Sequence, residues 1–276
     1  INCHSYLTYE MCSENFPDKA RFIPHAIPKN IFYEISDFEK TNYKVKILGE
    51  QRKDWFVAFW ANRNARRKRP GDLLHSWKLF LDKTKEKDAV LIVHTDPYDN
   101  EGVNMVEIIK MLDIKDNVVI STDKIDFDEM NILYNISDIT VNISFAEGFG
   151  LSTLESMQTG TPIVAVTTGG LTRQVINHKD GTENGAAIKP ALKNLVGSQN
   201  VPYIYEDYAD TKDIAEGILK IYNLDQDAKL QLSQKVKKYA YEEFSYERTI
   251  DLWHDSLLET IENWRDNRKN IYLEEF

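Results

Sequence analysis

"DITVNISFAEGFGLSTLESMQTGTPIVAVTT" occupies residues 138–168 and contains a complete strand, helix and strand pattern. Its two ends, 138–144 and 162–168, are short apolar and β-branched runs bounded by turn residues. Runs of this kind are typical of strands that are buried on both faces. Between them, a glycine-containing turn leads into a helical pattern over 152–159. The stretch therefore predicts two parallel strands joined by a helix.

The same alternation is found on the N-terminal side of this unit. Further strands are predicted at 55–60, 89–95 and 117–121, and further helices at 71–85, 101–113 and 126–136. Asp126 and Glu129 have the spacing of a capping box at the start of the last helix. Repeated strand and helix units predict an α/β fold, a parallel sheet with helices on both faces. Ligands of such sheets bind at the carboxyl ends of the strands.

The flanking segments do not continue the repeat. Residues 190–210 lack periodicity, which predicts an ordered surface loop or insertion, and "YKVKILGEQRKD" (43–54) reads as a polar lead-in. From 211 onward the pattern is entirely helical, with helices predicted at 211–223, 226–243 and 246–268. The last helix has a predicted packing stripe formed by apolar side chains at three- and four-residue spacing: Trp253, Leu257, Ile261 and Trp264.

Composition limits the classes of function. The 276 residues suffice for one large or two small domains, and the net charge of −10 argues against nucleic acid as the main partner. The two cysteines, Cys3 and Cys12, provide no disulfide framework, so we expect a reducing, cytoplasmic location.

No apolar run approaches the roughly 18 residues of a membrane span. The opening "INCHSYLTYE" has no methionine, which indicates the interior of a longer or processed protein.

"EGFGLSTLE" (147–155) forms the turn before the helix and predicts an anion site. The first backbone N–H groups of a helix lack internal partners, and the helix dipole adds positive potential there. Gly148 and Gly150 would let the backbone approach a ligand closely. A dinucleotide fingerprint, G-x-G-x-x-G, is the weaker alternative, because Thr153 stands at the third glycine position.

The two carboxylates of this stretch invite different interpretations. Glu147 would repel a phosphate, so we expect it to contact a neutral, hydroxyl-rich part of a ligand. Glu155 can accept hydrogen bonds from two neighbouring hydroxyls, as on a ribose. Ser152 and Glu155 also match a capping box, so a purely structural role for Glu155 remains an alternative.

A basic run, "ANRNARRKRPGD" (61–72), follows the first strand of the sheet. Five of the residues from 63 to 69 are arginine or lysine. A solvated or nucleic-acid-binding run is the plain alternative. The position after a strand end, beside a helix N-terminus, favours binding of a pyrophosphate instead.

Together these motifs resemble family 4 retaining glycosyltransferases of the GT-B fold. The resemblance rests on Glu147, "GFGLSTL", Glu155 and the following "SMQTGTPIVAVTTGGL", and on "NRNARRK" (62–68), in which Asn62 replaces a usual glycine. "FIPHAIPKNIF" (22–32) resembles the interdomain linker, "DGTENGAAIKP" (180–190) the end of the donor domain, and "FSYERTIDLW" (244–253) the C-terminal crossing helix.

The resemblance implies a Rossmann-like donor domain at 51–243, a crossing helix at 244–276, and at 1–50 only the remnant of an acceptor domain plus the linker. It implies catalytic roles for Glu147, Arg63 and Lys68, in which Glu147 binds sugar hydroxyls and the two cations hold the pyrophosphate. The implied donor-binding residues are Gly148, Phe149, Gly150, Leu151, Ser152, Thr153, Glu155, Lys124 and Ile125.

The implied activity is retaining hexosyl transfer from a UDP- or GDP-sugar to a hydroxyl acceptor, as in polysaccharide or glycoconjugate biosynthesis. Neither a metal nor a further cofactor is expected, because two cations and a helix dipole would carry the phosphate charge. A donor-binding fragment without transfer activity and a sugar-nucleotide epimerase of similar architecture are the alternatives. An epimerase would need acid and base groups on both sides of the sugar, which the sequence does not reveal.

Overall fold

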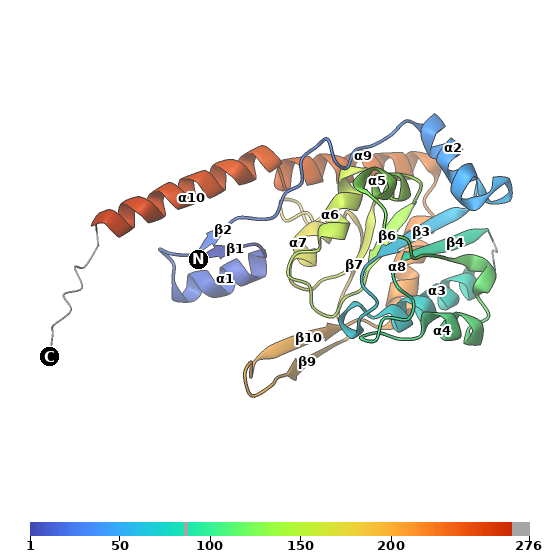
Figure 1. The fold of residues 1–276 in the computed structure, drawn as a ribbon, viewed down its shortest axis with the longest axis horizontal. Coiled ribbons are helices and arrows are strands. Elements are labelled where there is room, and N and C mark those ends of the chain that lie inside the picture. Colours follow the sequence, from blue (N-terminus) through green and yellow to red (C-terminus); the bar gives the residue numbers. More distant parts are fainter. Residues whose placement is uncertain (86–87, 267–276) are drawn as a thin grey trace.

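The computed structural model describes residues 1–85 and 88–266. Its centre is a six-stranded sheet in the order β5-β4-β3-β6-β7-β8, in which every neighbouring pair is parallel (Figure 1). The strands are β3 (Phe56–Ala61), β4 (Ala89–His94), β5 (Val118–Ser121), β6 (Ile139–Asn142), β7 (Ile163–Val166) and β8 (Gly185–Ile188). The predicted parallel sheet flanked by helices is confirmed.

The strand order reverses at β3. From there the chain runs outward through β4 to β5, then crosses back to place β6 on the other side of β3. The carboxyl ends of β3 and β6 therefore flank a topological switch point, where ligands of open α/β sheets bind. Both motifs singled out in the sequence, the basic run after β3 and the glycine turn after β6, belong to this point.

Helices cover both faces of the sheet. Alternate residues of β3 point to opposite sides, so that Ala58 and Trp60 join one core cluster and Val57 and Phe59 the other. The first cluster is closed by α3 (Pro70–Thr84), α4 (Met105–Met111) and α8 (Thr211–Tyr222). The second is closed by α5 (Phe127–Asn135), α6 (Leu151–Gln158), α7 (Leu171–Val175) and α9 (Gln226–Glu243). The predicted capping box of Asp126 and Glu129 is present at α5.

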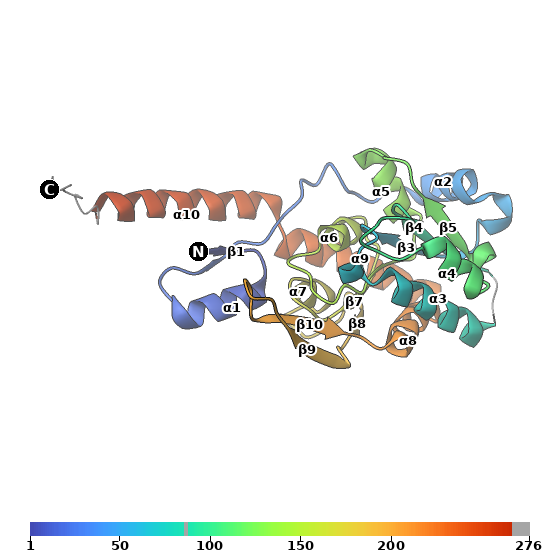
Figure 2. The same ribbon diagram turned by 60° about the horizontal axis from the view of Figure 1, so that its bottom comes forward.

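Two segments differ from their predictions. The first half of the supposed polar lead-in, 43–48, belongs to helix α2 (Asp37–Leu48), which starts with a capping box between Ser36 and Glu39. The supposed loop at 190–210 contains an antiparallel hairpin, β9 (Leu192–Val196) and β10 (Ile204–Tyr208), which projects from the body (Figure 2). The hairpin is held at its base by long-range contacts, including the ion pair of Arg66 with Glu206 at 2.5 Å.

The N-terminal segment packs beside the last helix. It consists of β1 (Asn2–Cys3), α1 (Tyr6–Asn15) and β2 (Arg21–Phe22), with α10 (Tyr246–Asp266) alongside it (Figure 1). Ser256 Oγ donates to Asn2 Oδ1 at 3.1 Å, and Arg21 pairs with Glu259. The predicted packing stripe of α10 is wrong for three of its members, because Leu257, Ile261 and Trp264 are all more than two-fifths exposed.

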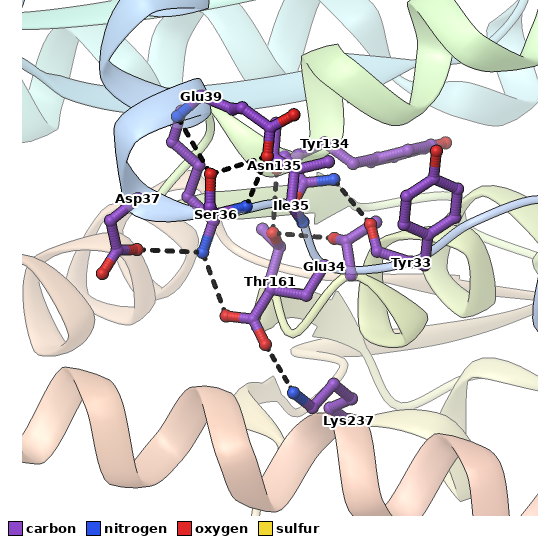
Figure 3. Close-up of polar contacts among 12 residues, drawn as sticks. Tyr33, Glu34, Ile35, Ser36, Asp37, Glu39, Tyr134, Asn135, Thr161 and Lys237 are labelled. Carbon is purple, nitrogen blue, oxygen red and sulfur yellow. Dashed lines mark hydrogen bonds and ion pairs between the residues drawn. The ribbon is translucent and has the colours of Figure 1, made fainter.

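The linker that leads into the domain is firmly attached to it. Asn135 at the end of α5 donates to the Tyr33 carbonyl at 2.9 Å and accepts from the Ile35 N–H at 3.0 Å (Figure 3). Glu34 pairs with Lys40 and Lys237, the latter on α9. Within residues 1–85 and 88–266, no helix is both long and apolar enough to cross a membrane.

Candidate functional site

Two loops meet at the switch point. The basic run forms a short 3-10 helix, Arg66–Lys68, directly before α3, and the turn after β6 leads to α6. The Phe145 N–H donates to the Arg67 carbonyl at 3.1 Å, which joins the two loops through their backbones. Arg67 Nη1 donates to the Ala146 carbonyl at 2.8 Å. The predicted proximity of the basic run to the glycine turn is therefore present.

Glu147 is the centre of a charged cluster. Its Oε2 accepts hydrogen bonds from Arg67 at 3.0 Å and from Ser144 at 3.3 Å, and forms an ion pair with Lys68. The side chains of Lys68 and Glu147 are only 12% and 11% exposed. Burial lowers the pKa of Lys68, and the Glu147 carboxylate opposes this shift. Each of these two charges needs the other, or a ligand, to offset its lost hydration.

The glycine turn continues into α6 without a side-chain cap. Gly150 is the N-cap residue, with φ of 92°, and no side chain hydrogen-bonds there. The capping-box alternative for Ser152 and Glu155 is therefore wrong, and the first N–H groups of α6 are left to a ligand or to water. Phe149 packs against Phe244 in the core, so only its backbone remains for a ligand.

Three more residues that were predicted to bind the donor substrate lie at the start of α6, and they differ in exposure. Thr153 is buried, and its Oγ1 lies 2.7 Å from the Gly150 carbonyl oxygen and 2.5 Å from Gln174 Oε1, two acceptors that share its single hydroxyl proton. Its side chain is thus committed to the fold, although its N–H lies in the first turn. Leu151 is 47% exposed, and Ser152 lines the cavity described next.

A cavity of about 440 Å³ lies at the carboxyl ends of β3, β4 and β5 and includes Ser152 and Glu155 of α6 in its lining. Its wall is supplied by the carboxyl ends of β3, β4 and β5 with the loops that follow them, and by α5 and α6. Its lining includes four predicted site residues together with a tyrosine, a histidine and several small polar groups: Arg63, Lys124, Ser152, Glu155, Tyr134, His94, Asn62 and Thr95. Ile125 instead packs against the apolar core.

Arg63 makes its ion pairs inside this cavity region rather than with Glu147. Its Nε donates to Asp99 at 2.7 Å, and its Nη1 lies 3.2 Å from Glu101. The guanidinium is 59% exposed, so a ligand in the cavity can draw it away at little cost. The structure thus joins Lys68 directly to Glu147 and places Arg63 with Glu155 on a common cavity wall.

The remaining cations of the basic run support the fold. Arg66 pairs with Glu206 of the hairpin, and Arg69 pairs with Asp72 at 2.8 Å. Each basic side chain from 63 to 69 has an acidic partner. Arg63, Arg66 and Arg67 are nevertheless 59%, 70% and 47% exposed, so the alternative of a solvated run stays open.

Tyr134 is a cavity residue that the sequence analysis missed. Its hydroxyl donates to Glu155 Oε2 at 2.6 Å. Burial raises the pKa of Glu155, and this hydrogen bond opposes the shift. The sequence offered a weak signal, a tyrosine near the end of an amphipathic helix, which ordinarily means core packing.

Two neutral groups on the cavity wall lack partners. Asn62 Nδ2 and Thr95 Oγ1 are buried and make no hydrogen bond within the described part of the chain. Buried polar atoms are nearly always paired. These two are therefore available to a polar ligand or to ordered water. Across residues 1–85 and 88–266, no three His, Cys, Asp or Glu side chains are grouped so as to hold a metal ion.

A second pair of glycines, Gly169 and Gly170, packs against the backbone of the glycine turn. Gly170 N–H donates to the Glu147 carbonyl at 3.0 Å. A Cβ atom on Gly170 would lie 2.6 Å from the Gly148 carbonyl oxygen, and one on Gly169 would collide with the Glu147 carbonyl. Glycine at both 169 and 170 is thus required for the close packing of this backbone against the turn.

Comparisons with known proteins agree with this architecture. The family model described as "Glycosyl transferases group 1" matches residues 40–196. A D-inositol 3-phosphate glycosyltransferase of Pseudarthrobacter chlorophenolicus is 29% identical over 126 residues, which are 46% of this chain and 30% of that protein.

Solved structures share the fold at low identity. Sucrose-phosphate synthase from Thermosynechococcus elongatus superposes with a TM-score of 0.70 and 20% identity, over 94% of this chain and 57% of that one. Anabaena Alr3699/HepE, solved with UDP and glucose, gives a TM-score of 0.73 and 15% identity, over 94% and 62% of the two chains. The chain therefore spans only part of the length of each of these proteins.

Proposed function

The chain belongs to the family of group 1 glycosyl transferases, and we propose that it is the donor-binding part of a retaining glycosyltransferase. It would bind a nucleotide-diphospho-sugar and present the sugar to a hydroxyl acceptor. The observation that carries this proposal is the pairing of Lys68 with Glu147 beside the uncapped start of α6, at the switch point of the sheet. The chemistry of that cluster suits a diphosphate joined to a polyol.

Binding would begin with an exchange of partners. In the free site Lys68 is neutralised by Glu147. A diphosphate oxygen competes for the ammonium group and also accepts from the first N–H groups of α6. Glu147 then loses its partner, and its oxygens are free to accept hydrogen bonds from sugar hydroxyls. Arg67, which is 47% exposed, can follow either group.

The adjoining cavity would hold the nucleoside. Glu155 lies on its wall with one oxygen bonded to Tyr134, and would accept hydrogen bonds from the ribose hydroxyls. Lys124, on the loop after β5, would line the base. Arg63 would leave Asp99 and turn to the diphosphate, where a doubly charged group is the stronger partner. A UDP- or GDP-sugar is the donor class that we propose.

The chemistry follows from where charge develops. When the bond between the anomeric carbon and the diphosphate oxygen breaks, negative charge collects on the leaving group. Lys68, Arg63 and the start of α6 would stabilise that charge, which is commonly the largest catalytic contribution. The same phosphate oxygen would accept the proton of the attacking hydroxyl, so that attack and departure share one face of the sugar and the configuration is retained.

The domain division is part of this proposal. Residues 51–243 would be the donor domain, residues 1–50 the end of an acceptor domain with its linker, and residues 244–276 the crossing helix. The packing of α10 along the N-terminal segment, through Ser256 and Asn2, supports this division. The last ten residues, 267–276, lie outside the described residues.

A binding panel tests the proposal directly. Isothermal titration with UDP, GDP, ADP and their glucose or mannose conjugates should show saturable binding of at least one nucleoside diphosphate. NAD should not bind, because the site offers no third glycine and no acidic residue for its ribose at the end of the next strand. Absence of binding by every nucleotide in the panel would contradict the proposed donor site.

Glu147→Ala should distinguish the contribution of the sugar to binding from that of the nucleotide. We expect nucleotide-sugar affinity to fall about tenfold to a hundredfold, since a charge-assisted hydrogen bond is lost. Affinity for the bare nucleoside diphosphate should stay equal or rise, because Lys68 loses a competitor. Titration of both ligands against both proteins measures the difference. Equal losses for the two ligands would assign Glu147 a purely structural role.

A further inference from the structure

Glu155 and Tyr134 form an unusually constrained pair on the cavity wall. Among the described residues, Glu155 has one hydrogen bond, through Oε2, and its donor is the Tyr134 hydroxyl at 2.6 Å. Burial disfavours the ionised form of Glu155 and raises its pKa. A neutral carboxylic acid would be a poorer acceptor for a diol than a carboxylate. The state of this one side chain therefore affects what the cavity can bind.

The tyrosine cannot move away from its partner. Its side chain is fully buried, and its ring packs edge-on against Phe32 at 5.7 Å and Phe59 at 5.2 Å between ring centres. Thr161 Oγ1 donates to its backbone carbonyl at 2.8 Å (Figure 3). Burial and the neighbouring carboxylate raise the pKa of Tyr134 well above its ordinary value. The hydroxyl thus stays protonated and remains a donor.

We infer that Tyr134 is a positioning residue for donor recognition, which fixes the Glu155 carboxyl group through Oε2 and leaves its other oxygen, Oε1, for the ribose hydroxyls. The inference rests on the proposed function, since it assumes that Glu155 meets a ribose. Tyr134 itself has its hydroxyl committed to Oε2. It acts through Glu155, and its removal should change how binding depends on pH and on the 2′-hydroxyl.

Tyr134→Phe tests this inference, because it should change the pKa of Glu155 and the binding affinity in a known direction. Without the tyrosine hydrogen bond, only burial acts on Glu155, so the pKa of Glu155 rises further. Nucleoside diphosphate affinity should therefore fall by about tenfold to a hundredfold near neutral pH and recover as the pH rises. The variant should also lose most of the preference for the ribonucleotide over its 2′-deoxy analogue. Titration calorimetry between pH 5.5 and 9 with both ligands measures these effects.

Other titratable groups face the same cavity and could add their own pH dependence: Arg63, His94, Asp96, Asp99, Asp123 and Lys124. Burial lowers the pKa of His94, which moves its titration toward the acidic end of the measured range. Glu155→Gln removes the group of interest and keeps the others. In that background, Tyr134→Phe should no longer shift the pH profile, whereas any contribution of His94 should persist.

A matched control separates positioning from loss of stability. Tyr239→Phe also removes a buried hydroxyl, which donates to the Arg173 carbonyl at 2.7 Å outside the cavity. It should lower the melting temperature about as much as Tyr134→Phe and leave the pH profile of binding unchanged. If wild type binds a nucleoside diphosphate and Tyr134→Phe keeps the wild-type profile and 2′-hydroxyl preference, the positioning role is refuted. If wild type binds none, the proposed function itself fails.

Discussion

Lys68→Met is expected to lower diphosphate affinity about a hundredfold and sugar transfer by about two to three orders of magnitude. The Lys68 side chain is only 12% exposed, and it lies against Glu147 where the leaving phosphate would bind. Methionine retains most of the side-chain volume and removes the charge. Titration of UDP or GDP measures the affinity, and a sugar-transfer assay with a nucleotide-sugar donor measures the rate.

Two further readouts identify the cause of that loss. The salt dependence of diphosphate binding should decrease, because one phosphate-neutralising charge has gone. Affinity of the wild type should also fall at alkaline pH, earlier than an ordinary lysine would cause, since burial lowers the pKa of Lys68. Lys68→Met should lack this decline. Unchanged affinity and unchanged salt dependence would place the diphosphate elsewhere.

Stability must be separated from binding in this experiment. Removing Lys68 leaves Glu147 buried with the exposed Arg67 as its remaining cation, at a cost of about 3 kcal/mol. Lys68→Met combined with Glu147→Gln removes both charges and should restore much of that stability. The double variant should still bind the diphosphate weakly. Full wild-type affinity in the double variant, which lacks the ammonium group, would show that Lys68 does not bind the diphosphate.

The sheet was predictable because its strands are short continuous apolar runs. Residues 89–94, for example, are buried on both sides except for His94, and such runs have few alternative structures. The location of the site followed from this, since motifs after two adjacent strand ends must lie together. Helix α2 was missed, although the capping box of Ser36 and Glu39 at its start is a local signal that is visible in the sequence.

Other features depend on contacts between distant residues. The hairpin of β9 and β10 lacks an alternating pattern and is anchored by Arg66, more than a hundred residues earlier. Tyr134 approaches Glu155 only because α5 and α6 pack together. The helical period of α10 correctly predicts a helix, but the apolar stripe does not show which of its side chains meet another surface. The periodicity of apolar residues along a sequence carries no information about contacts between residues that are far apart in the chain.

Gly170→Ala is expected to destabilise the protein by about 3 kcal/mol and lower Tm by about 6–10 °C. An added Cβ would lie 2.6 Å from the Gly148 carbonyl oxygen and would also overlap the backbone of Phe149. Both obstacles are main chain, so the turn that holds Glu147 must move. Nucleotide binding should be lost together with stability. Thermal unfolding with and without nucleotide measures both effects.

Gly148→Ala is the matched substitution on the other side of the same turn. A Cβ there meets no protein atom within 4 Å, and Gly148 does not have a positive φ, so Tm should stay within about 1 °C of wild type. The space that the methyl group enters is where the diphosphate or sugar would approach the backbone. We therefore expect intact stability with affinity for the nucleotide-sugar reduced at least about tenfold. Full affinity in Gly148→Ala would mean that the ligand does not approach this face of the turn, and the anion site at the start of α6 would then be wrong even if Gly170→Ala behaves as expected.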